Sequence, residues 1–530
     1  MKNLNSHSID PKSGYCSKTA SFHSLRPQFN LPPENIPLSV ASYVLALRSS
    51  FNPDSTVLID SATGHRFTYS DFTRRVNSLA SNLHHVIGLK KGDTALVVSP
   101  NSVRVPILYV SLLSLGVIVS PANPSSTPSE ISRLIGLSKP VTAFVTTATV
   151  QNIPSLSREP IVIDSPEFES LMSRPRQKLE RVRVSQNDLA AVMYSSGTTG
   201  KVKAVMLTHR NFIAIVGSFP WAGGTEGAAE KVMLYTVPYF HMFGFFYCLK
   251  SMALNETLVV MERFDMRRML EAVERFKVTH LAVAPPVVVA LVKGGVTEEF
   301  DLRSLVGVTC GGAPLGKDAI EAFVDRFPRA QLAQGYGMTE TTGGGFRMLS
   351  PEEALNWGSC GRLLGSCEAK IVDPETGIGL PPCYLGDSEA TSATLVSDGW
   401  LMTGDLCYID KEGYLFVLDR LKELIKYKGY QVAPAELEQL LQSHPDIVDA
   451  AVIPYPDEDA GEIPMAFVVK HYHSNIDEAG VKQFIAKQVA PYKKIRRLSF
   501  VNSIPKSASG KILRKDLIKT ALQQSTLSKL

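Results

Sequence analysis

The chain has 530 residues, of which 44% are hydrophobic, so it is too long for one ordinary domain and has ample apolar residues for a large core. It carries 55 basic and 51 acidic residues, and the net charge of +4 excludes the strongly basic composition typical of nucleic-acid-binding proteins. The seven scattered cysteines have neither zinc-site nor redox-motif spacing, which favours a reduced intracellular protein over a disulfide scaffold.

The N-terminal segment Met1–Asn30 is polar and lacks the apolar stretch of a secretory signal, and residues 1–35 are predicted to be loosely structured. From about residue 55, short β-rich apolar runs alternate with helical patterns. Thr94–Ser99 predicts a strand, Val105–Leu115 a buried helix that is too short to span a bilayer, and Val117–Ser120 another strand. This alternation predicts stacked βα units around mainly parallel sheets.

The pattern changes after about residue 360, where short strands alternate with glycine and proline turns. Residues 360–419 therefore predict a small β-rich subdomain. Beyond a boundary near residue 420, the helix pattern Pro434–Ser443 and the strand patterns that follow it predict a small α+β domain. The expected fold class is α/β: a large N-terminal domain of stacked βα subdomains at 36–419, with the β-rich subdomain at its end, and a small C-terminal domain at 420–530.

The first chemical motif is a loop of serine, threonine and glycine that follows the apolar strand Leu189–Met193. Residues 194–203 read Tyr-Ser-Ser-Gly-Thr-Thr-Gly-Lys-Val-Lys. Glycines allow backbone N–H groups to point into one concavity and the hydroxyls add donors, so this loop is suited to phosphate oxygens. It is not a Walker A loop, because Val202 follows Lys201 where serine or threonine is required. The alternative is an ordinary surface loop.

Three further motifs are individually weak. Gln334–Glu340 offers an aromatic ring for stacking on a base, a hydroxyl at Thr339, and at Glu340 the hard oxygens that Mg²⁺ prefers. Thr403–Asp405 places a carboxylate suited to ribose hydroxyls, and Ser507–Lys511 places a lysine in a small loop where it can neutralise a phosphorane. Each of these alone is more often a solvated surface group.

Taken in order, these motifs resemble those of the adenylate-forming superfamily, which includes acyl-CoA synthetases, firefly luciferase and the adenylation domains of peptide synthetases. The resemblance covers about residues 40–520. Two longer stretches, residues 419–438 and 504–516, narrow it to the 4-coumarate–CoA ligase-like branch, of peroxisomal type. It implies an acid–thiol ligase that uses ATP and Mg²⁺, takes a carboxylic acid and CoA as substrates, and has an adenylation domain followed by a mobile C-terminal domain.

The resemblance also implies roles for individual residues. ATP phosphates are expected at Ser195, Ser196, Gly197, Thr198, Thr199 and Lys203, although the family's usual glycine after this lysine is Ala204 here. The adenylate is expected at Ala313, Gln334, Gly335 and Tyr336. Thr339 is expected to make a catalytic phosphate contact, and Glu340 is the expected Mg²⁺ ligand. The ribose contacts are expected at Asp405 and Arg420, and further nucleotide contacts at Lys426 and Gln431. Lys511 matches the lysine of the adenylation step, Lys422 the interdomain hinge, and Lys428, Gly429 and Arg263 the contacts to CoA.

The acid is expected to bind beside His241, which matches a family histidine near the carboxylate; as a lone histidine it would more often be structural. Phe243 and Tyr247 complete the predicted substrate pocket. Hydroxycinnamate ligases often carry tyrosine and serine at these two positions. The sequence therefore argues against a simple hydroxycinnamate preference and leaves fatty, cyclopentanone and benzenoid acids open.

The implied mechanism has two half-reactions in one site. The carboxylate attacks the α-phosphate of ATP and forms an acyl-adenylate, and the small domain then rotates about Lys422 so that Lys428 and Gly429 face CoA. Two other enzyme classes share the fold. A luciferase-type oxygenase is distinguished by light emission, and a carrier-protein adenylation module is disfavoured because no carrier domain follows Lys511.

One departure from the family pattern lies after Pro382. Family members carry a strand and a turn between the Leu-Pro turn and a later Gly-Tyr pair, whereas Gly379–Ala390 here runs directly from the turn to Tyr384. About 15–18 residues, roughly one strand with its turn, are missing. A second hypothesis for the chain is therefore an inactive or impaired isoform.

Ser528, Lys529 and Leu530 form the tripeptide that a peroxisomal import receptor reads as an address. The alternative is a chance polar tail. The expected location is thus the peroxisome, with the import receptor as a partner, and neither nucleic acid nor a membrane span is expected.

Overall fold

The structure, a computed structural model, describes residues 9–48, 52–175, 177–195, 202–219, 230–293, 295–373, 379–380, 399–428, 430–457, 459–507 and 510–527. The chain divides into two compact units. Unit 1 comprises Met1–Arg26, Gly311–Arg326 and Phe346–Leu530, and unit 2 comprises Pro27–Cys310 and Phe327–Gly345.

The first sheet of unit 2 has the strand order β10-β9-β6-β5-β7-β8 and is parallel except for β10. Its strands are β5 (Thr94–Val98), β6 (Ile118–Ala122), β7 (Thr142–Val145), β8 (Ile161–Val162), β9 (Leu189–Ser195) and β10 (Lys203–Thr208). Every residue of β5 is buried, as expected for a parallel strand that is covered on both faces. The predicted strand at Thr94 and the predicted helix at Val105 are confirmed.

The second sheet of unit 2 contains, in spatial order, β15, β14, β13, β11, β12, β3 and β4. These strands span Gln331–Tyr336, Gly307–Cys310, His280–Val283, Val232–Tyr235, Thr257–Val260, Thr56–Asp60 and Arg66–Thr68, respectively. Only β4 runs antiparallel to its neighbour among these strands. The carboxyl ends of the parallel strands therefore share one edge, where Gln334–Tyr336 end β15.

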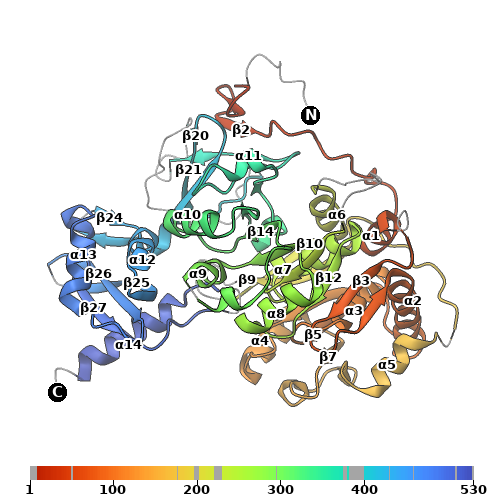
Figure 1. Ribbon diagram of the computed structural model, residues 1–530. Helices are drawn as coiled ribbons and strands as arrows, with labels where there is room; N and C mark the ends of the chain where they lie inside the picture. Colours follow the sequence, from red (N-terminus) through yellow and green to blue (C-terminus); the bar gives the residue numbers. More distant parts are fainter. Residues whose placement is uncertain are drawn as a thin grey trace. The chain divides into compact units, whose positions relative to one another are not determined.

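A layer of helices lies between the two sheets (Figure 1). It contains α1 (Val40–Arg48), α2 (Tyr69–His85), α3 (Arg104–Ser114), α6 (His209–Gly217) and α7 (Met242–Ala253). Helix α3 contacts β6 of the first sheet, whereas α2 and α7 contact β3 and β12 of the second. Most residues of α3 and α7 are buried, which is why these helices are apolar on nearly all sides. The remaining helices of unit 2 are α4 (Pro128–Ser138), α5 (Pro166–Ser173), α8 (Met266–Phe276) and α9 (Pro285–Lys293).

Unit 1 contains the predicted β-rich subdomain as short antiparallel pairs. These are β16 (Phe346–Arg347) with β17 (Arg362–Leu363), β19 (Ile371–Val372) with β20 (Gly379–Leu380), and β21 (Asp405–Ile409) with β22 (Leu415–Arg420). Helices α10 (Lys317–Arg326) and α11 (Pro351–Ala354) also belong to this unit. The residues after Pro382, where a strand is missing relative to the family pattern, lie outside the described residues.

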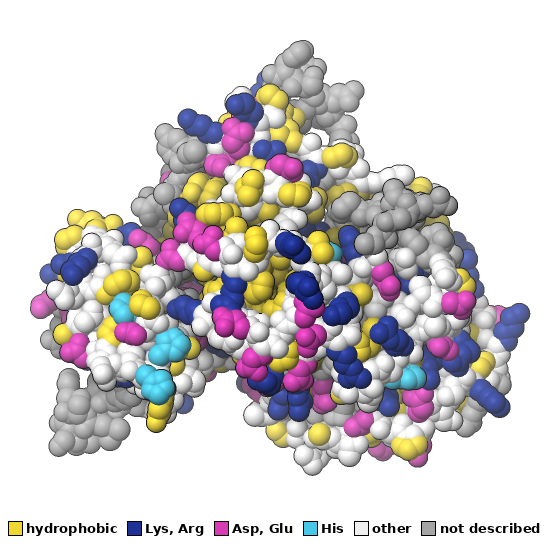
Figure 2. Space-filling model, viewed as in Figure 1, with side chains coloured by type: hydrophobic (Ala, Val, Ile, Leu, Met, Phe, Trp, Pro, Cys, Tyr) yellow, Lys and Arg dark blue, Asp and Glu magenta, His cyan; other side chains and the backbone are white. Residues whose placement is uncertain are grey.

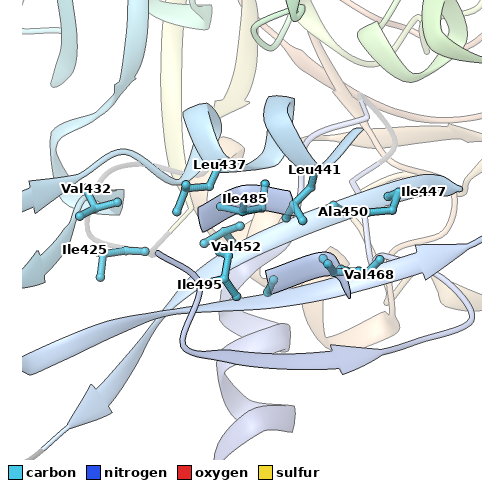
Figure 3. Packing of buried hydrophobic residues seen from close by; sticks show 12 residues of the cluster. Ile425, Val432, Leu437, Leu441, Ile447, Ala450, Val452, Val468, Ile485 and Ile495 are labelled. Carbon is cyan, nitrogen blue, oxygen red and sulfur yellow. The ribbon is translucent and has the colours of Figure 1, made fainter. Parts of the chain in front are cut away.

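The C-terminal part of unit 1 is an α+β sandwich around a sheet ordered β24-β23-β26-β25, with β27 beside β26. Its elements are β23 (Ile425–Tyr427), β24 (Tyr430–Val432), α12 (Pro434–Ser443), β25 (Ile447–Asp457), β26 (Gly461–Lys470), α13 (Glu478–Ala486), β27 (Arg497–Phe500) and α14 (Arg514–Leu527). Leu437 and Leu441 of α12 and Ile485 of α13 pack on Val452 (Figure 3). Ile453, the next residue, packs in a second cluster with Leu517 of α14, so the sheet is covered on both faces.

The surface carries mixed charges: Lys/Arg and Asp/Glu side chains are interspersed over the face in view (Figure 2). This agrees with the small net charge of the sequence. Among the described residues, no helix has the length and hydropathy needed to cross a membrane.

The N-terminal arm, residues 9–26, has more regular structure than the sequence predicted. Strands β1 (Tyr15–Cys16) and β2 (Ser21–His23) form a three-stranded sheet with β18 (Glu368–Ala369). The arm then ends at Arg26, which donates hydrogen bonds to the carbonyl oxygens of Leu363 (3.2 Å) and Arg347 (2.8 Å) and to Glu353 (2.8 Å). The arm was predicted to be loose from its polar composition, and local sequence could not reveal these contacts because the partners lie more than 300 residues along the chain.

We expect Arg26→Ala to lower the free energy of unfolding of unit 1 by about 2 kcal/mol, because two carbonyls and one carboxylate lose a charged donor that is only 17% exposed. Urea unfolding followed by hydrogen exchange at the β17 amides measures this. The control is Lys12→Ala, which removes a 3.8 Å pair with Glu412 whose side chains are 73% and 53% exposed. An equal effect of the two substitutions would contradict the inference that the hydrogen bonds of Arg26 stabilise unit 1.

Candidate functional site

The ends of the predicted phosphate loop are cross-strand partners in unit 2. Lys203 at the start of β10 pairs with Ser195 at the end of β9, so the loop leaves and re-enters the sheet at one point. Its central residues Ser196, Gly197, Thr198 and Thr199 lie outside the described residues. The 3₁₀ turn η4 (Thr339–Thr341) lies against both β9 and β10. The structure thus brings Thr339 and Glu340 to the base of the loop.

The turn that carries Thr339 is held by close backbone packing. A side chain at Gly337 is excluded, because its Cβ would lie 2.5 Å from the carbonyl carbon of Gly343. The N–H of Met338 donates to the hydroxyl of Thr341 at 3.0 Å, which closes the turn. Upstream, Gln334 is buried on β15, with Gly335 and Tyr336 completing the strand. These three positions, predicted to hold the adenylate, therefore sit on a rigid element.

The fit of a metal ion to this site depends on Glu340. No group of three or more His, Cys, Asp or Glu side chains suited to a metal occurs among the described residues. A single carboxylate nevertheless fits Mg²⁺, which usually keeps several waters and binds through one or two carboxylates together with substrate phosphates.

His241 occupies the N-cap position of α7. Its Nδ1 accepts a hydrogen bond from the N–H of Phe243 at 3.3 Å, and burial lowers the pKa of His241, so the imidazole is neutral at pH 7. The proton then resides on Nε2, which leaves that nitrogen as a donor. The turn before α7 is held by the segment between β5 and α3, because Asn101 Oδ1 accepts a hydrogen bond from the N–H of Tyr239 at 2.8 Å.

Aromatic rings follow His241 along α7. The rings of Phe243 and Tyr247 lie 4.8 Å apart, edge to face, and Tyr247 also contacts the ring of Tyr235 at 5.0 Å. Phe246 lies against Gly343, where a Cβ would approach its ring to 2.5 Å. Tyr247 is only 4% exposed, so it supports Phe243 from the core rather than forming open pocket surface.

Two predicted contacts are solvent-facing. Arg263, the predicted CoA contact, follows β12 and is exposed. Ala313, which belongs to unit 1, is also exposed.

In unit 1, the register of β21 with β22 places Asp405 opposite Arg420. Arg420 Nε lies 3.4 Å from Asp405 Oδ1, and the carboxylate is 7% exposed while the guanidinium is 37% exposed. Burial raises the pKa of the neighbouring Cys407 thiol to about 12, and the Asp405 charge adds to this shift. The cysteine is therefore a neutral packing residue, and Asp405 presents the anionic group here.

The register brings the predicted hinge to the same place. Lys422 lies in the 3₁₀ turn η5 (Leu421–Glu423) directly after Arg420 and is exposed. Lys511 comes from the other end of the C-terminal part, yet its ammonium lies 3.7 Å from Glu423 Oε1 and interacts electrostatically with Arg420 and Asp405. The structure thus groups Asp405, Arg420, Lys422 and Lys511.

The predicted CoA contact Lys428 begins the two-residue turn between β23 and β24. It has a left-handed backbone (φ 47°), as two-residue hairpin turns require, and its side chain is exposed. Lys426 and Gln431 pair across this hairpin. Gly429, the second residue of the turn, lies outside the described residues.

Three polar residues near Lys511 were missed by sequence reasoning: Glu423, Glu438 and Arg514. Arg514 lies 3.4 Å from Glu423 and 2.9 Å from Glu438, which is 9% exposed. A signal existed for Glu438, because it falls between Leu437 and Leu441 on the apolar face of α12. A carboxylate on such a face needs a buried partner.

The chain matches two protein families along most of its length. The AMP-binding enzyme family matches residues 47–387, and the AMP-binding enzyme C-terminal domain matches residues 436–511. Among curated relatives, 4-coumarate–CoA ligase-like 5 of Oryza sativa subsp. japonica is 49% identical over 528 residues, which cover 97% of this chain and 96% of the relative.

A second curated relative and a solved structure are also similar to the chain. Peroxisomal OPC-8:0-CoA ligase 1 of Arabidopsis thaliana is 42% identical, covering 98% of this chain and 100% of the relative. The solved structure of o-succinylbenzoate CoA synthetase (MenE) from Bacillus subtilis, in complex with the acyl-adenylate intermediate OSB-AMP, superimposes with a TM-score of 0.75. It is 26% identical and covers 89% of this chain and 97% of that chain. The chain therefore belongs to the AMP-binding enzyme family, in its 4-coumarate–CoA ligase-like branch.

Proposed function

We propose that the chain is an AMP-forming acid–thiol ligase, which activates a carboxylic acid with ATP and transfers the acyl group to CoA. The observation that carries the proposal is the grouping of Lys511 with Asp405 and Arg420, because it places one ammonium group suited to phosphate charge beside the predicted ribose contacts. The relatives named as CoA ligases support the reaction class.

The first half-reaction follows from the groups present. A carboxylate is a poor acyl donor, because oxide would have to leave. Attack on the α-phosphate of ATP releases pyrophosphate and gives an acyl-adenylate whose leaving group is AMP. Lys511 supplies positive charge to the phosphorus as negative charge develops there, and Thr339 contacts a phosphate. His241, neutral and protonated on Nε2, donates to the acid's carboxylate.

The second half-reaction needs a different set of residues. We propose that the part of the chain after a boundary near residue 420 rotates about Lys422. This movement withdraws Lys511 and presents the turn of Lys428 and Gly429, with Arg263, to CoA. The thiolate sulfur attacks the acyl carbon, the C–O bond to phosphate breaks, and AMP leaves. Lys426 and Gln431 contact the nucleotide.

The metal and the phosphate loop complete the nucleotide site. Glu340 is the residue that would hold Mg²⁺, and when bound the ion neutralises phosphate charge. Ser195 and Lys203 frame the loop whose serines, threonines and glycine are proposed to wrap the ATP phosphates. Ala313, Gln334, Gly335 and Tyr336 are proposed to hold the adenylate.

The acid that binds beside His241 and Phe243, with Tyr247 behind Phe243, is proposed to be a fatty, cyclopentanone or benzenoid acid rather than a hydroxycinnamate. The ring of Phe243 stands where many hydroxycinnamate ligases carry a tyrosine hydroxyl, so one polar contact is absent there. AMP release with a panel of acids from these classes identifies the substrate. Light emission with luciferin and ATP, without CoA, would point instead to the oxygenase alternative.

We expect Lys511→Ala to reduce adenylate formation by about 10²–10³-fold, since one preorganised charge at the phosphorane is lost. Transfer to CoA from a supplied acyl-adenylate is expected to stay within about twofold. Pyrophosphate exchange measures the first step and thioester formation the second. Lys519→Ala, an exposed lysine of α14, is the matched control. Equal loss of both half-reactions would contradict the assigned role.

We also propose a peroxisomal location, supported by the peroxisomal relative and by the tripeptide at Ser528–Leu530, which lies outside the described residues. An import receptor is then a partner of the chain. A fluorescent protein fused before Met1 is expected to give a punctate peroxisomal pattern, and deletion of Ser528–Leu530 is expected to move it to the cytosol. Replacing Ser525 by alanine is the control. A punctate pattern after the deletion would reject this address.

A second candidate, an impaired isoform, is favoured by one observation. The match to the Arabidopsis peroxisomal ligase extends over 550 residues although this chain has 530, so the relative has residues with no counterpart here. We expect that inserting a relative's strand and turn after Pro382 raises both the melting temperature and AMP release. A short chain that matches the restored one in both measurements would show that the fold absorbs the shortening.

A further inference from the structure

Glu423 lies at the centre of a group of charges that the sequence did not reveal. Its Oε1 lies 3.7 Å from Lys511 Nζ, and its Oε2 lies 3.4 Å from Arg514 Nε. The two cations are three residues apart in the chain, where the turn before α14 leads into the helix. One carboxylate, 18% exposed, thus receives two positive groups from one segment.

Arg514 is itself held from a second side. Its Nη2 lies 2.9 Å from Glu438 Oε2, while Glu438 Oε1 accepts the N–H of Val452 at 2.8 Å. Burial raises the pKa of Glu438 to about 7, and the Arg514 charge opposes this shift. Arg514 is therefore fixed to α12 and β25, so Glu423 is joined through it to the core of the C-terminal part.

The backbone of Lys511 is fixed by a different set of contacts. The N–H of Ser507 donates to the carbonyl oxygen of Lys511 at 2.7 Å, and the N–H of Lys511 donates to Ser507 Oγ at 3.1 Å. These bonds close the turn but leave the four-carbon side chain to rotate, and a lysine side chain has about 2 kcal/mol of rotamer entropy. Glu423 is the carboxylate within ion-pair distance of the ammonium among the described residues.

The electrostatic surroundings of Lys511 make this contact important. Burial, followed by the charges of Arg420 and Arg514, lowers its pKa, whereas Glu423 and Asp405 oppose the shift. The ammonium of Lys422 also interacts electrostatically with Lys511 and Arg420. Without Glu423, three like charges and Asp405 alone would surround the ammonium, so both its position and its protonation would change.

We infer that Glu423 is a positioning residue for the adenylation half-reaction, which holds the ammonium of Lys511 beside the Asp405–Arg420 pair. This inference rests on the proposed function, in which Lys511 acts on the α-phosphate. It assigns a second task to η5, the turn that contains the predicted hinge Lys422, because the same turn also carries the counterion of Lys511.

The test compares Glu423→Gln, which keeps the shape and loses the charge, with Glu423→Asp, which keeps the charge. Glu423→Gln is expected to lower kcat for pyrophosphate exchange at least about 10-fold, with KM for ATP within about twofold. Thioester formation from a supplied acyl-adenylate is expected to stay within about twofold. Glu436→Gln, which breaks a 2.7 Å pair with Lys493 in the same part of the chain, is the matched control.

The pH profile separates positioning from general destabilisation. Lys511 acts in its protonated form, so activity is lost as pH rises through its pKa. Removing the Glu423 charge lowers that pKa further and is expected to move the alkaline limb of kcat to lower pH, and Glu423→Asp is expected to move it back. An unchanged alkaline limb with a uniform loss of both half-reactions would overturn the inference.

A second readout does not depend on the proposed reaction. After reductive methylation with ¹³C-formaldehyde, the NMR signal of Lys511, identified by its absence in Lys511→Arg, reports its pKa directly. A lower pKa in Glu423→Gln, but not in Glu436→Gln, supports the contact even if no acid is adenylated by the native chain. An equal pKa in native chain and Glu423→Gln overturns the inference, whatever the reaction proves to be.

Discussion

The pairing of β21 with β22 is the constraint on which the chemistry of unit 1 depends. It sets Asp405 opposite Arg420, and the register shifts by one residue between Leu406 and Cys407, next to this pair. Such bulges re-aim the side chains beside them. Asp419, the neighbour of Arg420, is buried and accepts the N–H groups of Arg420 (2.7 Å) and Ala435 (2.9 Å). One strand end thereby orients the predicted ribose contacts, the turn of the predicted hinge and the start of α12.

Charge balance then governs how these elements pack. Three carboxylates and two cations meet in a partly buried region: Asp419, Glu423, Glu438, Arg514 and Lys511. Removing one partner of a buried ion pair lowers the free energy of unfolding by about 3–5 kcal/mol, because the other charge is left buried and unpaired. The arrangement leaves each carboxylate with a cation or with backbone donors. In its proposed role, Lys511 meets phosphate in one half-reaction and leaves it in the next, and a 3.7 Å contact suits that role better than a short, fully buried pair.

Local patterns predicted much of the fold. The helix at Pro434–Ser443 has the predicted bounds, because its leucine spacing and its proline at the first turn are local signals. The strand at Thr94 was equally clear, since it is apolar throughout. The contacts of the N-terminal arm could not be predicted, because they depend on partners far along the chain.

The candidate site likewise contains residues that local motifs predict and residues whose role depends on distant contacts. His241, Asp405 and Lys511 could be found from motifs, and the structure shows what surrounds each of them. Glu423 could not, because its importance comes from Lys511 and Arg514, about 90 residues along the chain, whose approach depends on how α14 packs on the sheet. For residues 196–199, the assignment to ATP phosphates remains a prediction from the motif.

The N-terminal arm has a consequence for how the protein is made. Ser24 bonds the carbonyl oxygen of Leu363, 339 residues later, and β2 pairs with β18 beyond it. At about 5–20 residues per second, the ribosome supplies these partners on the order of 20–70 s after the arm has emerged. During that interval Cys16 and Phe22, both buried in the finished fold, have no core to enter, and β2 offers an open strand edge. The yield of folded chain is therefore sensitive to chaperone supply and to translation speed, in a way that the activity of the finished enzyme does not reveal.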